Sequence, residues 1–207
     1  FHFLHGKKPN AAQMYKIISI ERHCWYICSH MRTEHCYIAY YKPTGIICTT
    51  EAVENNIIDA VQHPEKILPV GRLDKDSEGL ILLTTNKSII HKIIHPDFEH
   101  EKEYIVTLNL PLRNQFLKDM STGVNIGDAL TKPCIIKPEP GTRRVFRIIL
   151  KQGLNRQIRR MCAVFNYQVI QLKRVRIMHI ALGKLKPGEW RNLTDEEVEQ
   201  LVLETEN

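Results

Sequence analysis

Hydrophobic and polar positions follow a helical period most clearly in residues 155–166. The apolar stripe at positions i, i+3, i+4 and i+7 consists of Ile158, Met161, Cys162 and Phe165. The opposite face carries Arg156, Arg159 and Arg160. Asn155 precedes the pattern and is the expected N-cap residue. The segment therefore predicts an amphipathic helix with one buried face and one basic face.

Short apolar runs between turn signals predict most of the remaining elements. Residues 103–108 alternate polar and apolar side chains with period two, as a half-buried strand does. Further strands are expected at residues 37–41, 46–50, 68–73, 80–85, 129–137, 145–150, 169–176 and 177–182. Helices are expected at residues 56–62, 87–94 and 112–120, and a capping box from Thr194 to Glu197 begins a final helix. Interspersed strands and helices with several hairpins predict an α+β fold with a mixed, mostly antiparallel sheet.

Residues 1–36 show no clear core face and are expected to form an irregular N-terminal segment before a domain at residues 37–207. Residues 23–36 contain three histidines and three cysteines, so a zinc site could be drawn there. The usual Cys-x-x-Cys spacing is missing, and we expect no metal.

Six scattered cysteines in the whole chain do not form a disulfide framework and favour a reducing compartment, the cytoplasm.

Charge is distributed unevenly along the 207 residues, which carry a net charge of +6. Residues 141–188 hold twelve Lys or Arg and no Asp or Glu. A basic region on an otherwise acidic body predicts a polyanionic partner, most simply nucleic acid, although a solvated basic surface is the alternative. No apolar run approaches the roughly 18 residues that a membrane-spanning helix needs.

Asp74 lies in a charged loop between two apolar runs, and its position allows three interpretations. It could be a solvated surface carboxylate, as most aspartates are. Asp74, Asp76 and Glu78 also imitate the start of a calcium-binding loop, but the twelfth position is Thr85 and not the required Glu. A carboxylate held on a rigid scaffold can instead act as a nucleophile in sugar chemistry.

The third interpretation is supported by a family resemblance. Residues 70–86 closely resemble the catalytic signature of RNA pseudouridine synthases, Gly-Arg-Leu-Asp followed by Ser-x-Gly-Leu. Residues 42–45 (Lys-Pro-x-Gly), 101–107 (around a Lys-x-Tyr strand) and 152–161 (with Arg-Gln-Ile-Arg-Arg-Met) also resemble family elements. The similarity covers roughly residues 37–201 and is greatest to the RsuA-like ribosomal branch.

The resemblance implies a role for each candidate site residue. Asp74 corresponds to the essential aspartate that attacks the target uridine or its ribose, and Arg159 to the basic residue paired with it. Tyr104 corresponds to the tyrosine that packs on the flipped base. Arg72 corresponds to the arginine that fills the gap left by the flipped nucleotide. The residues expected to bind RNA are Lys42, Arg156, Arg160, Lys173 and Arg174.

The resemblance also implies a pseudouridine synthase fold with an RNA-binding cleft and isomerisation of uridine to pseudouridine without cofactor or metal. Ribosomal RNA, most simply from the large subunit, is the expected substrate of a monomeric enzyme, with transfer RNA as a second candidate. Members of this branch often begin with an S4-type RNA-binding module, and residues 1–36 do not resemble one. The rival interpretations are an RNA-binding or ribosome-assembly protein without catalysis and a metal-dependent hydrolase using Asp74, Asp76 and Glu78.

Overall fold

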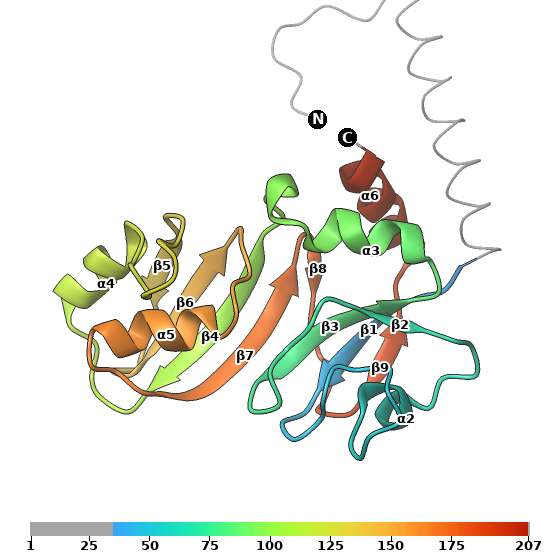
Figure 1. The fold of residues 1–207 in the computed structure, drawn as a ribbon, viewed down its shortest axis with the longest axis horizontal. Coiled ribbons are helices and arrows are strands. Elements are labelled where there is room, and N and C mark those ends of the chain that lie inside the picture. The colour runs from blue at the N-terminus through green and yellow to red at the C-terminus, as the bar shows by residue number, and fades with distance from the viewer. Residues whose placement is uncertain (1–34, 207) are drawn as a thin grey trace, which may run out of the picture.

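A nine-stranded sheet runs through residues 35–206, the part of the chain that the computed structural model describes (Figure 1). Its strand order is β5-β6-β4-β7-β3-β1-β9, with β2 paired to β3 and β8 paired to β7. The strands are β1 (Tyr37–Lys42), β2 (Leu68–Val70), β3 (Glu78–Thr84), β4 (Lys102–Leu108), β5 (Ile135–Pro138), β6 (Val145–Leu150), β7 (Val169–Ile177), β8 (Ile180–Ala181) and β9 (Trp190–Asn192). Only β3 and β7 pair in parallel among these strands, so the predicted α+β class with a mixed, mostly antiparallel sheet is confirmed.

The helices are α2 (Ile57–Val61), α3 (Lys87–Ile94), α4 (Asn114–Ser121), α5 (Gln157–Val164) and α6 (Asp195–Glu206), with a 3-10 turn at Pro96–Phe98. The predicted capping box is present, because Thr194 Oγ1 accepts from Glu197 N at 3.2 Å and the Glu197 carboxylate accepts from Thr194 N at 2.9 Å. The predicted N-cap of α5 is wrong. Arg156 occupies that position, with a left-handed backbone (φ 46°) and no side-chain cap bond.

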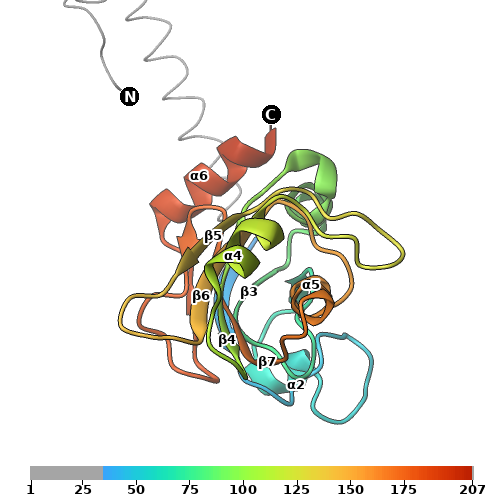
Figure 2. The ribbon, with the colours of Figure 1, turned by 90° about the vertical axis from the view of Figure 1, so that its left-hand side faces the viewer.

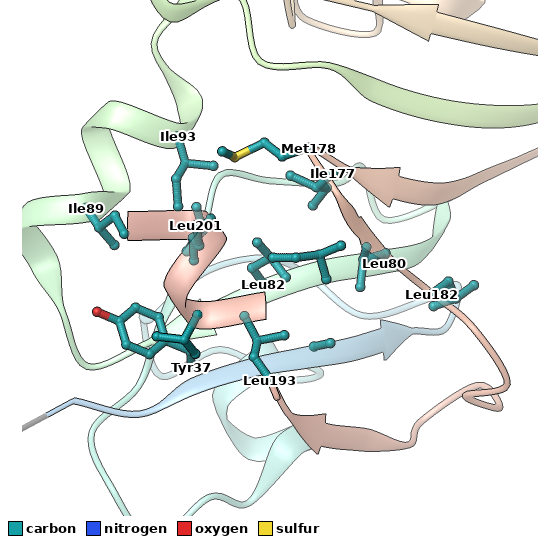
Figure 3. Packing of buried hydrophobic residues seen from close by; sticks show 14 of the residues in the cluster. Tyr37, Leu80, Leu82, Ile89, Ile93, Ile177, Met178, Leu182, Leu193 and Leu201 are labelled. Atoms are coloured by element: carbon teal, nitrogen blue, oxygen red, sulfur yellow. The ribbon is translucent and has the colours of Figure 1, made fainter. Parts of the chain in front are cut away.

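Strands β1 and β3 are covered on both faces. All six residues of β1 are buried. On one face, Tyr37 and Leu82 pack with Ile89 of α3 and Leu201 of α6 (Figure 3). On the other face, residues of β1 and β3 join a second core that contains both ends of α2. This double cover explains why these strands are almost uniformly apolar in sequence.

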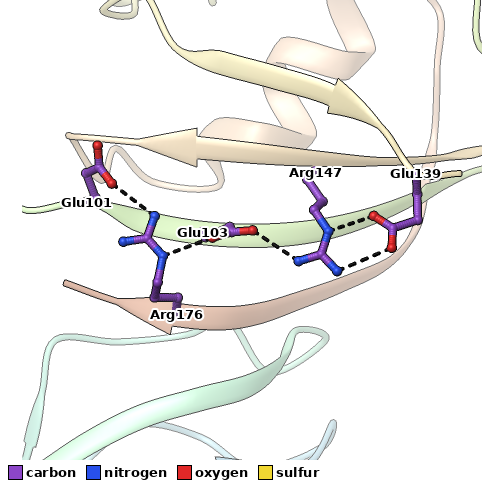
Figure 4. A network of polar contacts seen from close by, with 5 residues as sticks. All are labelled: Glu101, Glu103, Glu139, Arg147 and Arg176. Atoms are coloured by element: carbon purple, nitrogen blue, oxygen red, sulfur yellow. Dashed lines mark hydrogen bonds and ion pairs between the residues drawn. The ribbon is translucent and has the colours of Figure 1, made fainter. Parts of the chain in front are cut away.

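Strands β4 and β6 are covered on one face only, which explains their alternating pattern. Their inward residues pack with α4 and α5, and α5 is seen end-on beside these strands in Figure 2. The other face carries a chain of ion pairs (Figure 4). Its members are Glu101, Arg176, Glu103, Arg147 and Glu139, joined at distances of 2.6–3.0 Å.

The two halves of the sheet meet where β3 runs parallel to β7. Gly79 pairs with Arg174 at this junction and has a positive φ of 106°. A Cβ atom at Gly79 would lie 2.2 Å from the Arg174 carbonyl oxygen. Only glycine allows the two backbones to approach this closely.

Four predicted strands are shorter or absent, and one of them, expected at residues 68–73, ends with β2 at Val70. Residues 46–50 contain only an isolated bridge from Ile47 to Asn56, the N-cap residue of α2. Of the strand expected at residues 129–137, only the last residues form a strand, as part of β5. Of the separate strand expected at residues 177–182, only the two residues of β8 form one. No helix within residues 35–206 is long and apolar enough to span a membrane.

Candidate active site

The Asp74 loop connects β2 to β3 and is held by backbone bonds from two directions. Ser77 N donates to Asp74 O at 3.0 Å and closes the turn. Gly45 N donates to Lys75 O at 2.7 Å, which fastens the loop to the segment after β1. The Asp74 side chain remains 31% exposed. The loop therefore presents a partly solvated carboxylate from a backbone that is fixed on both sides.

Arg156 brings the start of α5 against this loop. Its guanidinium donates two hydrogen bonds to the Asp76 carboxylate, at 3.0 and 2.9 Å. The same group lies 3.6 Å from the Asp74 carboxylate, measured from Nη1 to Oδ2. The hydrogen bonds from Arg156 lower the pKa of Asp76, since they stabilise its charged form. Arg156 makes these contacts from a left-handed backbone conformation (φ 46°), which is strained for a residue other than glycine.

Arg159 does not make the contact expected of it. Its Nη2 donates to Asp76 O at 3.0 Å and lies 3.3 Å from the Asp76 carboxylate, and its Nη1 donates to Val169 O at 3.0 Å. Among the described residues, the guanidinium paired with Asp74 is that of Arg156. The expected pairing of Arg159 with Asp74 is corrected accordingly, because Arg159 lies one turn further along α5 and reaches the base of the loop.

A cavity of 840 Å³ opens beside Asp74. Its floor is formed by side chains of β4 and β7, including Tyr104 and Arg174, and its walls by α3, the Asp74 loop and the start of α5. Tyr104 and Asp74 both line it, so the structure brings these two predicted residues together. The exposed Arg72 also lines it, at the rim of the loop.

The other residues expected to bind RNA lie in different settings. Lys42 is fully buried and its Nζ donates to Pro43 O at 2.9 Å, so its amine cannot reach RNA, and that prediction is corrected. Lys173 lies on the opposite face of β7 from the cavity, with Nζ 4.8 Å from the centre of the Tyr41 ring. Arg160 pairs with Asp128 outside the cavity lining.

The sequence interpretation did not include Lys102 in the site. Lys102 lies two residues before Tyr104 on β4 and lines the same cavity. Burial, with a smaller contribution from Arg174, lowers its pKa to about 8. The Lys-x-Tyr spacing could have identified it, because residues two apart on a strand share one face.

No group of three or more His, Cys, Asp or Glu side chains is placed to hold a metal ion within residues 35–206. The histidine and cysteine cluster considered for zinc lies outside the described residues, apart from His35 and Cys36. The Asp76 carboxylate already forms ion pairs with Arg156 and Arg159. It is therefore not free to bind a metal ion together with Asp74.

The comparison with known proteins agrees with these observations. Residues 36–164 match the family of RNA pseudouridylate synthases. The chain belongs to this family. The resemblance inferred from the sequence motifs is thereby confirmed, and residues 70–86 lie within the matched range.

Relatives within the RNA pseudouridylate synthase family extend over most of the chain. The dual-specificity RNA pseudouridine synthase RluF of Escherichia coli (strain K12) is 50% identical over 82% of the chain. The ribosomal large subunit pseudouridine synthase B of Bacillus subtilis is 30% identical over 82% of the chain and 72% of its own length. The chain spans 58% of the length of the Escherichia coli relative. A crystal structure of a pseudouridylate synthase superposes with a TM-score of 0.74, at 30% identity, over 81% of this chain and 74% of that one.

Proposed function

We propose that this protein is an RNA pseudouridine synthase that isomerises uridine to pseudouridine in ribosomal RNA, with Asp74 as the essential carboxylate. The observation that carries the proposal is the shared cavity of Asp74 and Tyr104, with the Arg156 guanidinium 3.6 Å from the carboxylate. A volume of 840 Å³ is within the range of sites that hold a small molecule, and it leaves room for a single flipped nucleotide.

The reaction breaks the bond from ribose C1′ to uracil N1 and forms a bond from C1′ to C5 of the same base. Asp74 either attacks C1′ or removes a proton from C2′; both routes need an ionised carboxylate. The Arg156 guanidinium stabilises that charge and aims the carboxylate into the cavity. The proton lost from C5 in the final step balances the one gained at N1, so the isomerisation requires no oxidant or reductant.

Access to the target uridine requires that it leave the RNA stack. Tyr104 offers an aromatic face on which the flipped base can stack, worth about 1–3 kcal/mol. In this proposal Arg72, which is exposed and lines the cavity, enters the gap that the nucleotide leaves. Together these contacts offset the few kcal/mol that flipping costs.

The substrate class follows from the relatives. The Bacillus subtilis relative is named for the ribosomal large subunit, which favours large-subunit ribosomal RNA as the substrate here. The Escherichia coli relative is named for dual specificity, which leaves transfer RNA as the candidate second substrate. We expect the protein to act as a monomer in the cytoplasm, where these RNAs reside.

Incubation with unmodified ribosomal RNA in the presence of a chelator tests the proposal. New pseudouridine, mapped by chemical modification and primer extension, is the expected result. Strand cleavage that requires added metal would instead indicate the hydrolase interpretation. Binding without pseudouridine or cleavage would indicate an RNA-binding protein without catalysis.

A further inference from the structure

Arg174 is a buried cation that lines the cavity and carries a donor nitrogen without a partner among the described residues. Its residue is 3% exposed, and its Nε donates to Leu80 O at 2.6 Å, which fixes the guanidinium beside β3. Its Nη2 is buried and has no hydrogen-bond partner among the described residues. Because a buried donor without a partner costs about 1–3 kcal/mol, this group is poised for a ligand.

Arg174 has an aromatic and a cationic neighbour on the same face of the sheet. It lies directly opposite Tyr104 across the β4–β7 ladder, and Lys102 precedes Tyr104 by two residues on β4. All three side chains line the cavity. Cross-strand partners and residues two apart share one face, so both cations lie on the same face of the sheet as Tyr104.

The two cations lack a carboxylate partner within the part of the chain that the structure describes. No carboxylate among residues 35–206 forms an ion pair with Arg174 or Lys102, in contrast to Arg147, Arg156 and Arg176, which are all paired. Desolvation and the nearby Arg174 lower the pKa of Lys102, as expected for like charges held together out of water. An electronegative ligand group between them would relieve both effects.

We propose that Arg174, assisted by Lys102, binds the carbonyl oxygens of the flipped uracil and stabilises the negative charge that the base acquires as it leaves the ribose. This inference rests on the proposed function. When the C1′–N1 bond breaks, its electron pair passes to N1 and is delocalised onto O2 and, through the C5–C6 double bond, onto O4. Hydrogen-bond donors that are fixed in a desolvated site and aimed at these oxygens stabilise the base more strongly when it carries negative charge than when it is neutral.

The base edge is favoured over an RNA phosphate by position. The two cations lie on the sheet floor beside the ring on which the base stacks, whereas the exposed Arg72 lies at the rim. An arginine donor also discriminates between pyrimidines, because uracil presents an acceptor at O4 where cytosine presents an amino group. Arg174 is therefore expected to contribute to selection of uridine as well as to rate.

The test combines enzyme variants with single-atom changes in the substrate. Stem-loop RNAs carry uridine, 2-thiouridine or 4-thiouridine at the mapped target position, and isomerisation is followed by nucleoside chromatography under saturating enzyme. Sulfur accepts hydrogen bonds weakly, so we expect at least one thio substitution to slow the wild-type enzyme about tenfold. We expect Arg174→Leu to lose about 100-fold in rate on uridine and to show no further loss on that thio substrate.

Arg174→Lys and Lys102→Met provide independent comparisons if Arg174→Leu does not fold, as judged by circular dichroism. Arg174→Lys keeps the charge and is expected to recover part of the rate, and Lys102→Met is expected to reduce the thio effect. An equal effect of the thio substitution on the rate of wild type and of all variants would overturn the inference. Variants with weaker RNA affinity but an unchanged rate would also overturn it, because that result indicates a phosphate contact. Failure of the wild-type enzyme on the uridine RNA would refute the proposed function itself.

Discussion

The guanidinium of Arg156 lies 3.6 Å from the carboxylate of Asp74 and also donates two hydrogen bonds to Asp76. One side chain thus joins the start of α5 to the loop between β2 and β3. The arrangement gives Arg156 and Arg159 different tasks, although both belong to the same motif. Arg156 faces the cavity, and Arg159 supports the loop from below through Asp76 and Val169.

Substitution of these two arginines is expected to separate catalysis from stability. We expect Arg156→Met to lower the single-turnover rate about 100-fold, because Asp74 loses its charge partner. We expect Arg159→Met to lower the free energy of unfolding by about 2 kcal/mol, because it leaves backbone acceptors unpaired. Arg191→Met, which breaks the pair with Glu197 and a hydrogen bond to Asn192 O away from the cavity, serves as the control. A larger rate loss in Arg159→Met than in Arg156→Met would instead support Arg159 as the functional partner of Asp74.

The junction of the two half-sheets is expected to tolerate no side chain at position 79. We expect Gly79→Ala to destabilise the protein by more than about 4 kcal/mol, because its Cβ would collide with the Arg174 backbone. Gly127→Ala is the matched control, since Gly127 has nearly the same φ (101°) and open space at its Cβ position. Its backbone strain alone is expected to cost about 1–2 kcal/mol. Equal losses in urea unfolding would show that the close approach of β3 and β7 is unimportant.

Glu103 joins Arg147 and Arg176 in the ion-pair chain, and its contribution is expected to depend on pH. Burial opposes ionisation of Glu103, but hydrogen bonds from both arginines more than compensate, so its pKa lies below 4.5. A depressed carboxyl pKa stabilises the folded state above the unfolded pKa, and that stabilisation is lost as the pH falls through the folded pKa. We therefore expect Glu103→Gln to lower the free energy of unfolding at pH 7 and to differ less from wild type near pH 3. A difference that is constant between these pH values would contradict this assignment.

RNA affinity is expected to depend on fewer cations than the sequence suggests. Residues 141–188 are rich in Lys and Arg, but many of these side chains are paired with carboxylates from other segments. We expect Arg72→Gln to reduce the slope of log affinity against log salt by about 0.7–0.9, the value of one phosphate contact. Arg160→Gln is expected to change the slope less, because Asp128 already neutralises Arg160. Equal changes for both variants would show that the Asp128 pair opens on RNA.

The sequence predicted local features well where one strong signal governs them. Helix α3 has the predicted bounds, and the capping box at Thr194 begins α6 as expected. The α+β class followed from the alternation of strands and helices. The segment at residues 46–50 was mistaken for a strand, since short apolar runs also occur in loops that pack on a core.

The sequence predicted only part of the candidate site. Motif resemblance selected Asp74 and Tyr104, which share the cavity. It could not show that Lys42 is buried or that Lys173 faces away, because both depend on how strands pair and which face is covered. It also could not show that Arg156, at the N-cap of α5, is the arginine beside Asp74, because residue types alone do not reveal its left-handed backbone.

The most direct test compares the two neighbouring carboxylates of the loop in the same assay. Pseudouridine formation in ribosomal RNA is measured for wild type, Asp74→Asn and Asp76→Asn under single-turnover conditions, with folding checked by circular dichroism. We expect Asp74→Asn to lose at least about 10,000-fold in rate, and Asp76→Asn to lose about tenfold to 100-fold because it only positions Arg156. Substantial activity in a folded Asp74→Asn variant would contradict the central role of this carboxylate.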